Sequence, residues 1–318
     1  MPELEIQPFS DAHLDAAAAL LAQRHARHRE AEPLLREAVD FPGEIAALRA
    51  REGASGAVAL RDGKVVGYLL GTRRDDDAWG PNVWVEAAGH AVEEAEDVRD
   101  LYAAVANDWV EEGRTAHYAI VPAADDTLVD AWFRLGFGGQ HAHGIQEVPP
   151  HTAVHVPAGV EIRRPSADEV EELIDVDLAL PTHQARAPVF SLRRPPSREE
   201  SRREWLETLA GDEEHILVGY LDGRPVACWS FAPLERSGEH TGLTRPERAA
   251  FLGFAATLPE VRGSGIGLAI TDTGFAWAAE QGYRVMVTDW RETNLLASRF
   301  WPRRGFRRTF LRLYRSIP

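Results

Sequence analysis

The stretch that decides the fold is residues 251–267, FLGFAATLPEVRGSGIG. Its first eight residues are apolar or small, which is typical of a buried strand, and Pro259 ends the run because proline cannot donate to a sheet ladder. Glycines then alternate with small residues just before a helix predicted over 264–281. Backbone amides in such a loop can point inward together, beside the positive end of the helix dipole. The stretch therefore predicts a strand, a loop that holds a phosphate or pyrophosphate, and a helix.

Two common phosphate loops do not fit this stretch. A P-loop needs Gly-Lys-Ser/Thr, where the chain has GLA at residues 267–269. The dinucleotide fingerprint needs a third glycine at position 268, which is Leu268. Residues 259–267 instead resemble the pyrophosphate loop of the GNAT superfamily of CoA-dependent acyltransferases, Arg/Gln-x-x-Gly-x-Gly/Ala with a proline three residues before the arginine.

Later segments continue the resemblance in the order that the family has. They are the strand VMVT at 285–288, Asn294-x-x-Ala297, and the pair Gly305-Phe306. The resemblance covers the second half of the chain almost end to end. In the first half it covers fold landmarks only.

The chain contains an internal repeat, and the matching segments lie about 160 residues apart. Each half has a short strand ending in a serine that can cap a helix, an Asp-Gly hairpin between apolar strands, and a Trp-to-Phe segment with glycine before the phenylalanine. The matching segments are 5–10 with 161–166, 61–68 with 221–228, and 132–137 with 301–306. A Pro-bearing stretch, 148–159, separates the halves. We therefore expect two α/β domains with mixed sheets (α+β), a degenerate GNAT-like domain over 1–150 and a GNAT domain over 158–318.

Composition limits the partners. The 318 residues carry a net charge of −15, which repels nucleic acid and anionic lipid and attracts cations. We expect no membrane segment, because the chain has neither a long apolar run nor the features of a signal peptide at its start. Cys228 is the only cysteine, which excludes an intrachain disulfide and fits a reducing cytoplasm. We also expect no metal, and the sequence leaves monomer or homodimer open.

The resemblance implies direct transfer of an acyl group from a CoA thioester to an amine. By position in the family, Thr257 and Leu258 would lie beside the pantetheine, and Asn294 would contact the cofactor arm. The backbone around the pyrophosphate would come from Val261, Arg262, Gly263, Ser264, Gly265, Ile266 and Gly267. The expected cosubstrate is acetyl-CoA, and the expected acceptor is a small-molecule amine such as a metabolite or an antibiotic-like amine.

The catalytic side departs from the family pattern at one position. The family's usual Tyr, which protonates the departing thiolate, is Trp301 here, and an indole N–H cannot act as a general acid. The proton would then come from water or Ser298. Candidate bases for the amine are Asp289, at the end of a predicted strand, and Glu247, at the start of the preceding one.

The first half lacks the phosphate loop. At the place of the loop it has EEAEDV, residues 93–98, with four carboxylates and no glycine. A phosphate there would meet like charges, so this copy should not bind CoA in the usual way. Alternatives for the whole chain are an acyl group larger than acetyl, a thiol or hydroxyl acceptor, or a non-catalytic CoA-binding or regulatory module.

Overall fold

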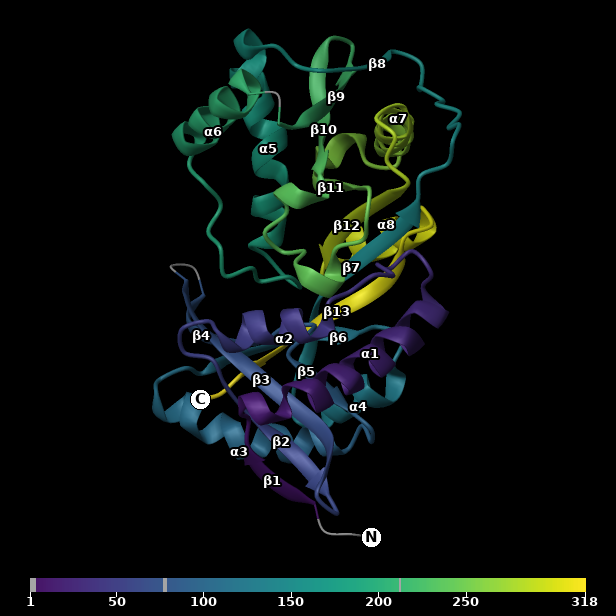
Figure 1. Ribbon diagram of the computed structural model, residues 1–318. Coiled ribbons are helices and arrows are strands. Elements are labelled where there is room, and N and C mark those ends of the chain that lie inside the picture. Colours follow the sequence, from purple (N-terminus) through teal and green to yellow (C-terminus); the bar gives the residue numbers. More distant parts are fainter. Residues whose placement is uncertain (1–3, 77–78, 212) are drawn as a thin grey trace. The chain divides into compact units, whose positions relative to one another are not determined.

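A computed structural model describes residues 4–76, 79–211 and 213–318 (Figure 1). The chain divides into two compact units. Unit 1 comprises 1–143, 241–245 and 308–318, and unit 2 comprises 144–240 and 246–307. Among the described residues, no helix combines the length and apolar character that a membrane span requires.

Unit 1 is built on a sheet in the order β1-β2-β3-β4-β6-β13, with the short β5 paired to β3. Its pairs are antiparallel except for β4 with β6. Its strands are β1 (Glu5–Pro8), β2 (Ser55–Arg61), β3 (Lys64–Asp76), β4 (Gly80–Val85), β5 (His90–Val92), β6 (Ala116–Pro122) and most of β13 (Arg307–Ser316), and its helices are α1 (Leu14–Ala31), α2 (Phe41–Arg49), α3 (Asp97–Glu111) and α4 (Asp126–Arg134).

The two faces of this sheet follow from the period-2 alternation of apolar side chains. Val58, Tyr68 and Leu70 point into a core with α1 and α2 residues, while Ala59 and Leu69 point into a second core with α3 and α4 residues. Both faces are therefore covered by helices, as Figure 1 shows for unit 1.

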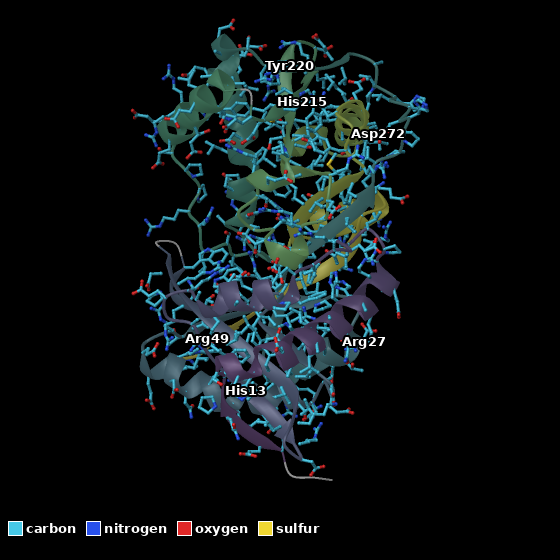
Figure 2. The ribbon with its side chains drawn as sticks, in the orientation of Figure 1. His13, Arg27, Arg49, His215, Tyr220 and Asp272 are labelled. Carbon is cyan, nitrogen blue, oxygen red and sulfur yellow. The ribbon has the colours of Figure 1, made fainter. Side chains whose placement is uncertain are left out.

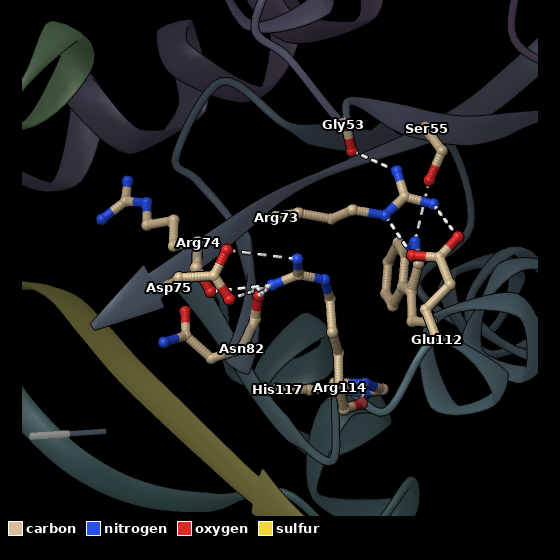
Figure 3. A network of polar contacts seen from close by, with 10 residues as sticks. Gly53, Ser55, Arg73, Arg74, Asp75, Asn82, Glu112, Arg114 and His117 are labelled. Atoms are coloured by element: carbon tan, nitrogen blue, oxygen red, sulfur yellow. Dashed lines mark hydrogen bonds and ion pairs between the residues drawn. The ribbon is translucent and has the colours of Figure 1, made fainter. Parts of the chain in front are cut away.

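A polar network ties the end of β3 to the end of α3 within unit 1 (Figure 3). Arg73 donates to both carboxylate oxygens of Glu112 and to the carbonyl of Gly53. Arg114 pairs with Asp75 at 3.2 Å. Arg73 and Arg114 are thus each paired with a carboxylate of the same unit, so their charges have a structural role.

Unit 2 repeats the arrangement with the order β7-β12-β11-β10-β9-β8. β11 and β12 pair in parallel, and β8 to β11 pair antiparallel. Its strands are part of β7 (Gly138–Glu147), β8 (Val160–Arg163), β9 (His215–Leu221), β10 (Arg224–Pro233), β11 (Ala249–Thr257) and β12 (Val285–Arg291), and its helices are α5 (Val170–Gln184), α6 (Arg198–Ala210), α7 (Ile266–Glu280) and α8 (Ala297–Arg303).

In unit 2, α7 covers one face of the sheet, while α5 and α6 lie on the other side of β9 and β10 (Figure 1). On the α7 face, His215 stacks on Trp277 with ring centroids 4.7 Å apart. Figure 2 marks His215 and Tyr220 along β9 and Asp272 on α7. The carboxylate of Asp272 accepts a hydrogen bond of 2.7 Å from Arg304, which links α7 to the end of α8. These contacts hold α7 against the sheet and against the end of α8.

The predicted mixed α/β fold is confirmed. The units differ from the predicted ranges 1–150 and 158–318, because residues 308–318 group with unit 1. The reason is that β13 pairs with β6 from Phe310 to Ser316. The predicted domain ranges, 1–150 and 158–318, stay a prediction.

Candidate functional site

The predicted phosphate loop has the backbone that its glycines require. Gly263 and Gly265 have φ angles of +83° and +90°, a region that side-chain-bearing residues rarely adopt. A Cβ at Gly263 would meet no atom within 4 Å, so the space above the loop is open. Gly265 is the residue that precedes the first turn of α7. The loop is therefore exposed and shaped by its backbone.

The amides at the start of α7 are free to bind an anion. Within the part of the chain that the structure describes, the amides of Gly265, Ile266 and Gly267 donate to no protein acceptor. A hydrogen bond within the loop stabilises its conformation, because Ser264 Oγ donates to the carbonyl of Val261 at 2.7 Å. A helix of 15 residues adds the positive end of its dipole at the same place. These features form a preorganised site for a phosphate group.

The strand that leads into the loop separates from its neighbour. β11 pairs with β12 from Ala249 opposite Val285 to Leu252 opposite Thr288, and Thr288 Oγ1 donates to the Leu252 carbonyl at 2.9 Å. Beyond that pair, β11 continues to Thr257 with no described strand on its β12 side. Its backbone groups there can hydrogen bond to an extended, amide-bearing ligand.

A β-bulge lies where the strands part. Ser230 pairs with Phe254 and Phe231 pairs with Leu252, which leaves Gly253 as the extra residue of β11. Bulges redirect side chains and backbone groups and are common beside active sites. The bulge, the unpaired edge of β11 and the glycine loop therefore follow one another along the chain. An extended ligand could contact all three.

Asn294 is fully buried, at 3% exposure, just before α8. Its Oδ1 accepts from the amides of Leu296 and Ala297 at 3.2 and 3.3 Å, and it lies 3.3 Å from His183 Nε2. The side chain therefore organises the turn before α8. Its predicted contact with the cofactor arm stays a prediction, as do the ligand contacts of Thr257, Leu258 and the loop.

The predicted catalytic residues lie on different elements of unit 2. Asp289 directly follows Thr288, so it lies where β11 and β12 part, and its side chain is half-buried. Glu247 is exposed two residues before β11, and Ser298 is half-buried on α8. Of the three, Asp289 has the position that a base beside the parting strands would need. The catalytic roles stay predictions.

The corresponding turn of unit 1 is occupied by ion pairs. Glu93 pairs with Lys64 at 2.6 Å, Glu96 with Arg134 at 2.8 Å, and Asp97 with Arg61 at 2.5 Å. Burial raises the pKa of the Asp97 carboxyl, although Arg61 opposes that effect. Four carboxylates thus stand where unit 2 has open amides. That this turn does not hold a pyrophosphate stays a prediction.

Sequence reasoning missed three carboxylates of unit 2. Asp177 on α5, Glu204 on α6 and Glu214 just before β9 line one cavity together with the thiol of Cys228. Each looks like an ordinary charge of a solvated helix or turn in the sequence. Only the packing of α5 and α6 on the sheet brings them together.

The sequence match to a known family falls in the second half of the chain. Residues 180–306 match the model of the acetyltransferase (GNAT) family. These residues form a GNAT domain. No curated protein matches the sequence.

Solved structures share the fold over the whole chain at low identity. A GCN5-related N-acetyltransferase from Sphaerobacter thermophilus is 13% identical at a TM-score of 0.61, covering 98% of this chain and 95% of that one. A GCN5-related glucosamine N-acetyltransferase region of a fungal multi-domain β-N-acetylglucosaminidase is 17% identical at a TM-score of 0.54, covering 99% of this chain and 38% of that one. At these identities the likeness shows the fold alone.

Proposed function

We propose that the chain is an acyl-CoA-dependent N-acyltransferase that transfers an acetyl group from acetyl-CoA to the amine of a small molecule. The observation that carries the proposal is the glycine loop before α7, with its free amides at Gly265, Ile266 and Gly267. The GNAT match over 180–306 includes this loop. The family uses acyl-CoA, and the parting of β11 and β12 supports an extended ligand that runs toward the same loop.

In this proposal the loop amides bind the pyrophosphate, and the free edge of β11 binds the pantetheine arm. The neutral amine attacks the thioester carbon, a C–N bond forms, and the C–S bond breaks to release the thiolate of CoA. Asp289, at the point where the strands part, removes the proton from the attacking amine directly or through water. The thiolate then takes a proton from water or from Ser298.

One observation favours a second candidate, a CoA-binding module without turnover. Trp301, where the family usually has Tyr, is 5% exposed and packs against Phe300 and Phe306. A buried indole supplies no proton to a thiolate. This candidate predicts binding of acetyl-CoA without release of thiol.

The experiment that separates the candidates is a thiol-release assay with acetyl-CoA and a panel of small amines. The enzyme proposal expects amine-dependent release of free CoA thiol and an acetylated product detectable by mass spectrometry. Matched alcohols serve as controls for the acceptor atom. Tight binding of acetyl-CoA without release across the panel would support the module instead.

A further inference from the structure

A small cavity lies in unit 2 between α5, α6 and the strands β9 to β11, and its volume is about 120 Å³. It is on the sheet face opposite α7, because Ile216 and Cys228 alternate with the residues that pack on α7. Its lining combines carboxylates, aromatic rings and small polar groups. The lining residues are Asp177, Glu204, Trp205, Thr208, Glu214, Ile216, Cys228, Ser230 and Phe254.

The three carboxylates of the cavity have no cationic partner. Among the described residues, no Lys, Arg or His forms an ion pair with Asp177, Glu204 or Glu214. Three other acidic residues nearby in the sequence are paired, namely Asp175 with Arg198, Glu171 with Arg202 and Glu213 with Arg236. The three carboxylates that line the cavity therefore keep their negative charge uncompensated by the described side chains.

The carboxylate of Asp177 is held in place by helix α6. Ser201 on α6 donates a hydrogen bond to this carboxylate, which fixes its position without neutralising its charge. Burial raises the pKa of the Asp177 carboxyl. A half-buried carboxylate of this kind gains stability from a cation that enters the cavity.

Two further features point to a ligand. Cys228 is 1% exposed and lines the cavity, and its thiol has no hydrogen-bond partner among the described residues. Trp205 and Phe254 add aromatic and apolar surface, which binds alkyl chains and attracts ammonium groups. A buried polar group without a partner, beside uncompensated charge and aromatic rings, is the lining that an alkylammonium group requires.

The size of the cavity limits the ligand. An apolar cavity of roughly 150 Å³ holds benzene, so 120 Å³ admits a short unbranched chain but no substituted ring. Ser230 and Phe254, which line the cavity, also flank the bulge at Gly253 where β11 and β12 part. A chain with one end in the cavity can therefore direct its other end toward the parting strands.

We propose that this cavity binds one ammonium group of a linear aliphatic diamine and, resting on the proposed acyltransferase function, that such diamines are its acceptor class. The carboxylates of Asp177, Glu204 and Glu214 hold the charged end. The free amine at the other end is the nucleophile. A monoamine can place its ammonium group in the cavity but then has no second amine to attack the thioester, so a diamine meets both requirements.

The test is calorimetric titration of the full chain with diaminobutane, butylamine and butanol, each with and without CoA. Diaminobutane and butylamine should both bind, butanol should not bind, and only diaminobutane should release thiol from acetyl-CoA. Glu214→Gln should weaken diaminobutane binding about tenfold, since it removes one charge at constant size. Glu213→Gln is the matched control, because Glu213 is the adjacent residue, pairs with Arg236 and does not line the cavity.

The outcomes separate the two proposals. Absence of diaminobutane binding in both the presence and absence of CoA, in a protein that binds acetyl-CoA, would overturn the cavity proposal alone. Diaminobutane binding in a protein that does not bind acetyl-CoA would overturn the acyltransferase proposal alone. Equal weakening by Glu213→Gln and Glu214→Gln would also overturn the cavity site. If Glu214→Gln unfolds the protein, Glu204→Gln on an exposed position of α6 provides the same comparison.

Discussion

The indole ring of Trp301 meets the ring of Phe306 edge to face, with centroids 5.5 Å apart and an interplanar angle of 80°. Unit 1 repeats the contact between Trp132 and Phe137, at 4.8 Å and 80°. Edge-to-face pairs of this kind stabilise a core beyond their buried area. The tryptophan therefore packs the helix that precedes the last strand in both halves, and its place in unit 2 is structural.

Trp301→Ala is expected to lower the free energy of unfolding by about 3 to 5 kcal/mol, because it leaves a cavity under α8. Trp301→Phe should keep most of that stability and leave the pH dependence of thiol release unchanged. Urea denaturation and a pH–rate profile measure the two effects. A loss of turnover in Trp301→Phe at unchanged stability would show that the indole takes part in the chemistry.

Gly274→Ala tests whether the packing of α7 supports the phosphate loop. A Cβ at Gly274 would lie 2.0 Å from the ring of Phe231 on β10, so the substitution must displace α7. We expect a loss of about 1 to 3 kcal/mol in stability and weaker acetyl-CoA binding. Gly238→Ala is the control, since a Cβ there meets nothing within 4 Å. Similar effects of both substitutions would contradict the packing argument.

The raised pKa of Asp177 makes diaminobutane binding depend on pH. As the pH falls through that pKa, the carboxyl is protonated and the affinity for diaminobutane should decrease. The stability has the opposite sign, because a carboxyl with a raised pKa in the folded state favours folding when it is protonated. Asp177→Asn should reduce both dependences. An affinity that does not change between neutral pH and the acid range would exclude Asp177 from the binding site.

Asp289→Asn is expected to reduce the rate of thiol release by about 10² to 10⁴ while acetyl-CoA binding is kept, because it removes a general base but leaves the loop intact. Glu247→Gln, at an exposed position before β11, should change the rate little. Steady-state kinetics and calorimetry check the two quantities. A large loss in Glu247→Gln alone would assign the base to Glu247, and full activity in both variants would exclude both residues.

Local signals made much of the fold predictable. The Asp-Gly pairs were sufficient to predict both hairpins, and Asp62, Gly63, Asp222 and Gly223 all have positive φ, as two-residue hairpin loops require. The glycine loop is likewise encoded by residues next to one another in the sequence. Such features depend on backbone conformations that few residues other than glycine, asparagine and aspartate adopt.

The sequence did not predict which distant strands pair or which distant side chains come together in the fold. The alternation in residues 307–316 predicts a strand but does not identify its partner, and β13 pairs with β6 in unit 1. Asp177, Glu204 and Glu214 come from three elements, and each has the sequence context of a solvated charge. Only tertiary packing distinguishes them from paired neighbours such as Glu213.

The central claim is that the loop before α7 binds the pyrophosphate of an acyl-CoA. Its most direct test is calorimetric titration of the full chain with acetyl-CoA, beside a Gly265→Glu variant that places a carboxylate and a strained backbone in the loop. The account predicts one binding site in the wild type and its loss in the variant at unchanged diaminobutane binding. No binding of acetyl-CoA to the wild type, or equal binding to both proteins, would contradict it.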